Sequence, residues 1–135
     1  MTNQPSSTGR PVALVTGASD RVGAVIAQTL AREGYAVVIH YRSNGDGARN
    51  VRQEIEDTGG LAAIIHADLA DRSQRAGLIT GAADFFGPVT VLINNASTFV
   101  PDSIRDVDEA LWDQHFAIHA EAPIFLSRDF SAQLP

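Results

Sequence analysis

The sequence predicts an α/β fold in which helices cover both faces of a parallel sheet. Short apolar runs alternate with amphipathic stretches along the 135 residues, and turn-forming residues separate the two kinds of segment. Connections between parallel strands are right-handed, which leads to helices on both faces of such a sheet. The length allows one domain. We expect this domain at residues 11–135, behind a disordered polar tail at residues 1–10.

The expected elements follow one another in a regular order. Each strand is a short run of apolar residues, and each helix carries apolar residues three or four positions apart. A third helix is expected to start near Asp71 and to end before Gly87. In a long helical stretch at residues 106–130, Pro123 predicts a kink or a restart. The expected strands are residues 12–15, 36–40, 61–65 and 89–93.

The composition excludes several kinds of function. The net charge is −6, whereas nucleic acids and anionic membranes require a basic face, so neither is expected as a partner. All ten basic residues are arginine, which excludes a phosphate-binding loop ending in Gly-Lys-Ser/Thr and a Schiff-base lysine. Without cysteine there is neither a disulfide nor a thiolate nucleophile. No apolar run approaches the length of a membrane span and the N-terminus lacks a signal peptide pattern, so a cytoplasmic location is expected.

A glycine-containing turn separates the first expected strand from the first expected helix. It reads Thr-Gly-Ala-Ser-Asp-Arg-Val-Gly at residues 16–23. Gly17 allows a sharp turn, Gly23 lets the helix pack closely on the strand, and free N–H groups at the helix start attract a pyrophosphate. A doubly wound, Rossmann-type sheet binds dinucleotides at this place. The alternative is an ordinary strand-to-helix turn.

The end of the second expected strand indicates which dinucleotide is bound. NAD-selective sites place an Asp or Glu about twenty residues after the glycine turn, where it holds the ribose 2′-OH. No carboxylate stands in residues 35–45, which offer His40, Arg42 and Ser43 instead. With Arg21 across the same pocket, two guanidinium groups and a hydroxyl would meet a 2′-phosphate. We therefore expect NADP(H), with a solvated loop charge as the alternative for Arg42.

These motifs resemble those of the short-chain dehydrogenase/reductase family, whose cofactor loop reads Thr-Gly-x-x-x-Gly-x-Gly. The resemblance extends over residues 11–135. Arg21 stands at the middle glycine, and together with His-Tyr-Arg-Ser at residues 40–43 it is similar to the pteridine reductases of that family. Three further matches follow in the family's order, namely Asp68-Leu69, Asn-Asn-Ala-Ser at residues 94–97, and Phe99.

The resemblance implies a site for NADP(H) and for a flat substrate. In the family the aspartate matched by Asp68 hydrogen-bonds the adenine, while Phe99 resembles the ring that stacks on a pterin and Ser97 touches the pterin or the cofactor phosphates. The alternatives are that Asp68 shares the N-cap role of the following helix with Asp71 and that Phe99 fills the core beneath a loop. The implied cofactor residues are Gly17, Ser19, Arg21, Val22, Gly23, His40, Tyr41, Arg42, Ser43, Asp68, Leu69, Asn95, Ala96 and Ser97.

Two histidines, His115 and His119, are four residues apart on the last expected helix. This spacing can bind zinc, but no Glu stands between them in the metalloprotease position, and no metal is expected. His119 occupies the position at which the family has the asparagine of its catalytic tetrad. The resemblance therefore makes His119 a candidate catalytic residue, which either hydrogen-bonds in place of the asparagine or alters the proton relay.

The resemblance also implies the activity of the parent protein, an NADP-dependent oxidoreductase that reduces a C=N or C=O bond of a pterin or similar small molecule. The family's catalytic Ser or Asp, Tyr and Lys follow a fifth strand. We therefore expect an amino-terminal part, truncated after the fourth strand and its helix and inactive alone. Trp112, Phe116 and Leu126 are expected in the helix core and in a homo-oligomer interface. The alternative is a non-catalytic nucleotide-binding or partner-binding module.

Overall fold

Four parallel strands form one sheet in the computed structural model, which describes residues 6–135. They are β1 (Val12–Val15), β2 (Ala36–Tyr41), β3 (Leu61–His66) and β4 (Val89–Ile93). The strand order is β3-β2-β1-β4, and every neighbouring pair is parallel. The chain first moves outward from β1 to β3 and then returns to place β4 on the other side of β1. The predicted Rossmann-type α/β fold is confirmed, and its strand order reverses beside β1.

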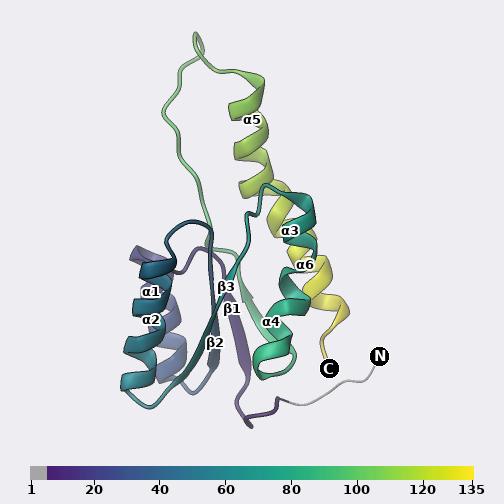
Figure 1. The fold of residues 1–135 in the computed structure, drawn as a ribbon. Coiled ribbons are helices and arrows are strands. Elements are labelled where there is room, and N and C mark those ends of the chain that lie inside the picture. The colour runs from purple at the N-terminus through teal and green to yellow at the C-terminus, as the bar shows by residue number, and fades with distance from the viewer. Residues whose placement is uncertain (1–5) are drawn as a thin grey trace.

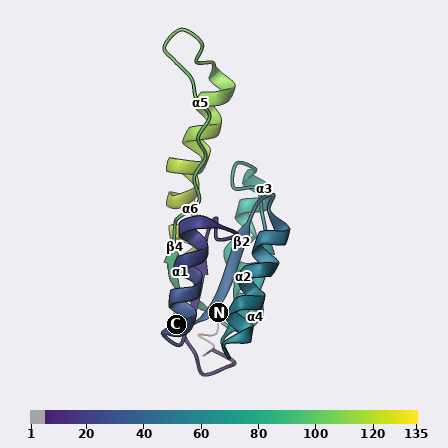
Figure 2. The ribbon, with the colours of Figure 1, turned by 90° about the vertical axis from the view of Figure 1, so that its left-hand side faces the viewer.

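The helices follow the strands in the expected order. Their bounds are α1 (Arg21–Arg32), α2 (Gly45–Asp57), α3 (Arg72–Ala76), α4 (Leu78–Phe86), α5 (Glu109–Phe116), the π-helical turn η1 (Ala117–Glu121) and α6 (Ala122–Ala132). Helices α1 and α2 cover one face of the sheet, while α4 and α6 cover the other (Figure 1). Helix α5 extends beyond the sheet, on the side of the loop that follows β4 (Figure 2). None of the helices in residues 6–135 is long and apolar enough to cross a bilayer.

The two central strands are buried on both faces. Leu14 and Val38 lie in the core beneath α4 and α6, whereas Val15 and Val37 lie in the core beneath α1 and α2. Successive side chains of a strand point to opposite faces, so both faces of β1 and β2 require apolar residues. This is why uninterrupted apolar runs identify these strands in the sequence. Leu126 is also part of the core and is not available for a subunit contact.

The third expected helix is divided in two at Gly77. Asp71 caps α3, because its carboxylate accepts hydrogen bonds from the N–H groups of Ser73 and Gln74. Helix α3 ends at Gly77, and α4 begins directly after it. Glycine is a weak helix former, and the break lets the two short helices bury different side chains. Periodicity alone therefore predicts one helix where the structure has two.

The last helical stretch also differs in detail from the expectation. It begins at Glu109 instead of residue 106, with Asp108 as its N-cap. The expected irregularity is present: η1 interrupts the α-helix, and α6 restarts one residue before Pro123. Proline is tolerated in the first turn of a helix because the N–H groups there lack intrahelical partners.

The expected disordered tail covers residues 1–10, of which residues 1–5 lie outside the described part of the chain. Residues 6–10 form turns that are attached to the end of α4. The backbone N–H of Ser7 and the hydroxyl of Ser6 donate to the carbonyl oxygen of Phe86, at 3.0 and 3.1 Å. The last carbonyl groups of a helix lack intrahelical partners, so this end of α4 holds residues 6 and 7 in place.

Candidate functional site

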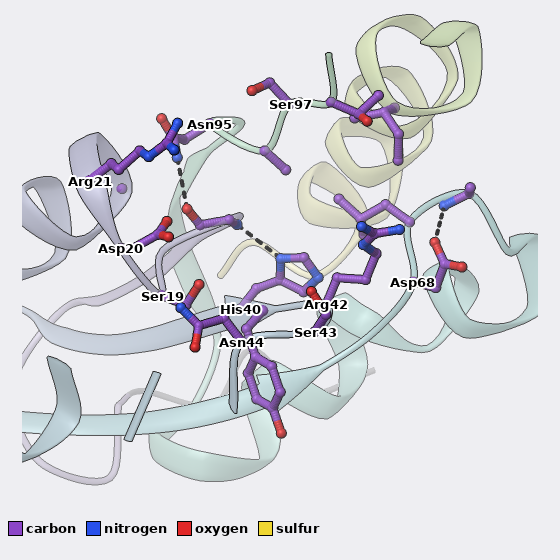
Figure 3. A pocket seen from close by; sticks show the side chains of 18 of the residues that line it. Ser19, Asp20, Arg21, His40, Arg42, Ser43, Asn44, Asp68, Asn95 and Ser97 are labelled. Atoms are coloured by element: carbon purple, nitrogen blue, oxygen red, sulfur yellow. Dashed lines mark hydrogen bonds between the residues drawn. The ribbon is translucent and has the colours of Figure 1, made fainter. Parts of the chain in front are cut away.

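An open cavity of about 790 Å³ lies at the carboxyl end of the sheet, where the strand order reverses. The segments that follow all four strands border it (Figure 3). Ligands of open α/β sheets bind at this location. All the residues that the sequence predicts to bind the cofactor border this cavity: Gly17, Ser19, Arg21, Val22, Gly23, His40, Tyr41, Arg42, Ser43, Asp68, Leu69, Asn95, Ala96 and Ser97.

The sequence interpretation missed several residues of the cavity wall. Some are chain neighbours of predicted positions, and adjacency alone would have found them. Gln114 and Ile118 come instead from α5 and η1, which reach the cavity only through tertiary packing, and no local pattern marks them. The missed residues are Asp20, Asn44, Ala70, Thr98, Gln114 and Ile118.

The glycine turn after β1 has no room for side chains at either glycine. Gly17 has φ +62°, a left-handed conformation that favours glycine, and a Cβ atom there would lie 2.8 Å from Cα of Ala96. A Cβ atom at Gly23 would lie 2.2 Å from the carbonyl oxygen of Gly17 and 2.6 Å from Nδ2 of Asn95. The predicted roles of both glycines, a sharp turn and a close approach of helix and strand, agree with this geometry.

The side chains of Thr16 and Asn95 join the glycine turn to the end of β4. Oγ1 of Thr16 accepts hydrogen bonds from the N–H groups of Asn95 and Ala96, at 3.0 and 2.9 Å. In return, Nδ2 of Asn95 donates to the carbonyl oxygens of Thr16 and Gly17, at 3.1 and 3.0 Å. The amide nitrogen of Asn95 is thus occupied by the protein itself. Its position at the cavity was predicted, but its side chain stabilises the turn.

His40 borders the cavity without a free ring nitrogen. Its side chain is 2% exposed; Nδ1 accepts the N–H of Gly17 at 3.0 Å, and Nε2 donates to the carbonyl oxygen of Ala67 at 2.8 Å. Burial lowers the pKa of His40 below its ordinary value, which favours the neutral ring. Both ring nitrogens thus have partners within the protein, so the side chain offers no free nitrogen to a ligand, and the assignment of His40 as a cofactor-binding residue stays a prediction.

Arg21 and Arg42 supply the basic groups of the cavity, on either side of the His40 ring in Figure 3. Within residues 6–135 neither guanidinium forms an ion pair with a carboxylate. Arg21 has φ +50°, the one non-glycine residue of the described chain with a positive φ. Its backbone thus keeps a conformation suited to the glycine of the family pattern, while its side chain adds a positive charge.

Asp68 lies beside the cavity and does not cap a helix. Its Oδ1 accepts the N–H of Ala70 at 3.0 Å, while the following helix is capped by Asp71. Of the alternative that Asp68 and Asp71 share the capping role, only the part for Asp71 holds. Leu69 is buried beside it. The pair thus presents one carboxylate and one apolar side chain to the same end of the cavity.

The loop after β4 is attached to α5 and η1 by two histidines. Nε2 of His119 accepts the N–H of Thr98 at 3.3 Å, and Nε2 of His115 accepts the N–H of Val100 at 3.5 Å. Nδ1 of His115 donates to the carbonyl oxygen of Leu111 at 2.9 Å, and the two imidazole rings stack with centroids 5.9 Å apart. Within residues 6–135 no group of three or more His, Cys, Asp or Glu could hold a metal ion.

This arrangement changes the expectations for His119 and Phe99. Neither residue borders the cavity. The ring of His119 accepts a hydrogen bond from the loop, and its catalytic role stays a prediction. Phe99 is 83% exposed, so the alternative that it fills the core is wrong, and it does not reach the cavity within this chain. Ser97, in contrast, borders the cavity as predicted.

An ion-pair cluster fixes η1 against α3. The carboxylate of Glu121 accepts a hydrogen bond from Nε of Arg72 at 2.6 Å and lies 3.1 Å from Nη1 of the buried Arg75. The hydrogen bond from Arg72, together with the nearby guanidinium of Arg75, lowers the pKa of Glu121. The π-helical turn that carries His119 is thereby attached to the helix that follows β3.

The chain belongs to the short-chain dehydrogenase family, whose sequence pattern matches residues 11–135. An uncharacterized oxidoreductase of Methylorubrum extorquens is 36% identical over 123 residues, which are 91% of this chain and 50% of the relative. Elsinochrome reductase 1 of Elsinoe fawcettii is 34% identical over 129 residues, 93% of this chain and 48% of the relative. The chain thus spans about half the length of the curated relatives it matches.

Solved structures of this family superpose closely on the chain. The FolM alternative dihydrofolate reductase 1 from Brucella suis, solved in complex with NADP, has a TM-score of 0.86 and 40% identity over 93% of this chain and 50% of that one. A blue fluorescent protein from a metagenomic library, solved with NADPH, has a TM-score of 0.87 and 33% identity. The match covers 93% of this chain and 51% of that protein. The family resemblance of the sequence is thus confirmed.

The geometry at Gly23 predicts that a single methyl group disrupts the turn. Gly23→Ala should lower the free energy of unfolding by about 1–3 kcal/mol, because the new Cβ overlaps backbone and Asn95 atoms that other hydrogen bonds hold in place. Gly77→Ala is the matched control, since a Cβ at Gly77 meets nothing within 4 Å and its φ is negative. Denaturant unfolding measures both variants; equal stabilities would contradict the role given to Gly23.

The histidine contacts predict the dynamics of the loop after β4. Replacing both His115 and His119 by Leu removes two acceptors, so amide hydrogen exchange at Thr98 and Val100 should accelerate by about tenfold. Replacing both by Gln retains a carbonyl acceptor near each Nε2 position and should leave exchange slow. The N–H of Leu111, which bonds to Asp108, serves as the internal reference. Unchanged exchange in the Leu variant would show that the loop is held by other contacts.

Proposed function

We propose that the protein is an NADP(H)-dependent oxidoreductase that reduces a C=N or C=O bond of a pterin or similar small molecule. The observation that carries this proposal is the pair Arg21 and Arg42, which border a cavity at the strand-order reversal, while residues 35–45 around the end of β2 contain no carboxylate. NAD-selective sites have an acidic residue there. Solved relatives from Brucella suis, a metagenomic library and Burkholderia cenocepacia contain NADP or NADPH and support the choice of cofactor.

The proposed pyrophosphate site lies at the start of α1. The N–H of Gly17 bonds to the His40 ring, and the N–H of Ala18 bonds to the His40 carbonyl oxygen, so neither is available to a ligand. Within α1, the first intrahelical bond runs from Ala24 to Asp20. The N–H groups of residues 21–23 therefore lack helical partners and can donate to phosphate oxygens.

The two ends of the cofactor follow from this placement. The ribose 2′-phosphate would meet Arg42 and Ser43 directly after β2, with Arg21 opposite them. The adenine would lie between the carboxylate of Asp68 and the side chain of Leu69. The nicotinamide end would then extend past the glycine turn towards Ser97, on the loop after β4. In this orientation the bound cofactor would supply the hydride at the end of the cavity that Ser97 borders.

The substrate class is proposed from two observations. Arg21 and the His-Tyr-Arg-Ser run at residues 40–43 are similar to pteridine reductases, and the alternative dihydrofolate reductase of Brucella suis is 40% identical to this chain.

The proton that accompanies hydride transfer needs an acid. These residues contain no lysine, so they supply no Tyr–Lys pair, and we propose that residues 1–135 bind cofactor without rapid turnover. A stacked aromatic pair, Trp112 and Phe116, remains exposed for a second subunit.

Cofactor selectivity tests the proposed function. The protein should bind NADP(H) at least about tenfold more tightly than NAD(H), because one charge-assisted hydrogen bond contributes about 1.5–3 kcal/mol. Arg42→Asp should reverse the preference, since the carboxylate repels the 2′-phosphate and accepts the 2′-OH. Calorimetric titration with both cofactors at one ionic strength measures this. Arg32→Asp, at the far end of α1, is the charge-matched control, and equal wild-type affinities for the two cofactors would refute the assignment.

Arg21 allows stability and binding to be separated. Its left-handed backbone costs about 1–2 kcal/mol in a residue with a side chain, so Arg21→Gly should stabilise the fold or leave it unchanged. The same variant should weaken NADP(H) binding, because a guanidinium group is lost from the cavity. Thermal unfolding and NADP⁺ titration on the same samples measure both quantities. A variant that binds NADP⁺ as the wild type does would exclude Arg21 from the phosphate site.

A further inference from the structure

His40 is a buried titratable residue for which the proposed function has no direct use. Its ring lies between two loops that follow different strands: the glycine turn after β1 and the segment after β3. The backbone around it joins the same two loops. The carbonyl oxygen of His40 accepts the N–H of Ala18 at 2.9 Å, and that of Tyr41 accepts the N–H of Ala67 at 3.2 Å. The end of β2 is therefore bonded to both loops through side chain and backbone together.

The two contacts of the ring determine its tautomer. The carbonyl oxygen of Ala67 only accepts, so Nε2 of His40 carries the hydrogen. The N–H of Gly17 only donates, so Nδ1 presents a lone pair. One neutral tautomer satisfies both partners. A protonated ring would direct an N–H group at the N–H of Gly17, and that hydrogen bond would be lost.

We propose that His40 is a positioning residue for the cofactor, which it does not contact: as a neutral imidazole it holds the glycine turn in the shape that presents the start of α1 to the pyrophosphate. This inference rests on the proposed function. Gly17 is the residue at which the chain turns, with φ +62°, and a Cβ atom there would lie 2.8 Å from Cα of Ala96. Protonation of the ring would break its hydrogen bond to Gly17 and release the turn. Cofactor affinity should therefore depend on the charge of the ring.

The surroundings of the ring set the direction of this pH dependence. Burial lowers the pKa of His40, and the nearby His66 lowers it further, while the Ala67 hydrogen bond and the charge of Asp68 raise it. The neutral form is thus present at neutral pH, and protonation requires acid. Affinity for NADP⁺ should be constant above the ordinary histidine range and should fall as the pH decreases below it.

The test compares His40→Gln, His40→Leu and the control His66→Gln by calorimetric titration with NADP⁺ between about pH 8 and pH 5. Gln carries an acceptor and a donor but does not titrate, whereas Leu carries neither. At pH 8, His40→Leu should bind NADP⁺ about tenfold more weakly, because Gly17 N–H loses its buried acceptor. His40→Gln should retain most of the affinity. His66→Gln removes a neighbouring histidine without touching the turn and should bind as the wild type does.

The acid range gives the decisive comparison. The 2′-phosphate itself titrates near pH 6, which weakens binding to every variant alike. The wild type and His66→Gln should lose more affinity on acidification than His40→Gln does. Equal losses in the wild type and His40→Gln would overturn the proposal. If His40→Leu does not fold, this comparison of two folded proteins still decides it.

Nuclear magnetic resonance examines the contact without cofactor. A through-hydrogen-bond coupling between the amide nitrogen of Gly17 and Nδ1 of His40 should be present at neutral pH and should disappear when the ring is protonated. If the wild type does not bind NADP⁺, the proposed function fails although the coupling is present. If the coupling is present and His40→Leu binds NADP⁺ with wild-type affinity, the positioning role fails while the proposed function stands.

Discussion

The shape of the candidate site depends on how the glycine turn after β1 is held. Thr16 and Asn95 bond it to the end of β4, and His40 bonds it to the ends of β2 and β3. Parallel strands bring these loops together at one edge of the sheet, but strand pairing ends before the loops begin. The side-chain hydrogen bonds therefore continue the order of the sheet into a region without secondary structure. These hydrogen bonds fix the turn, and the turn sets the direction in which the N-terminus of α1 points.

This organisation separates the residues that hold the site from those that would meet a ligand. Thr16 and His40 are almost completely buried, and their polar atoms are used within the protein. Arg21 and Arg42 are exposed and form no ion pair within residues 6–135. A buried polar group without a partner is costly, so buried members of a site tend to have internal partners, whereas exposed charges remain available. Bordering a cavity is therefore weaker evidence for ligand contact than the availability of donor atoms.

The sequence predicts the parts of the molecule that local patterns determine. Apolar runs identify the four strands because β1 and β2 bury both faces, and the spacing of Gly17 and Gly23 locates the turn. It does not predict the division of a helix at Gly77, which depends on how α3 and α4 pack. Nor does it show whether the ring of His40 contacts a ligand or forms hydrogen bonds within the protein. The second possibility depends on Ala67, which is far along the chain. The exposed position of Phe99 likewise follows from a loop whose attachment involves residues of α5 and η1.

Arg21 shows how a departure from a family pattern can be compatible with the fold. The position calls for a left-handed backbone, which glycine adopts freely and arginine adopts at a cost of about 1–2 kcal/mol. The close approach of helix and strand occurs at Gly17 and Gly23, where a Cβ would overlap neighbouring atoms, and both remain glycine. The side chain of Arg21 is exposed at the cavity, so a larger residue there meets no steric obstacle. The substitution thus costs a limited backbone strain and places a positive charge next to the N–H groups that start α1, where the proposed function requires a phosphate to bind.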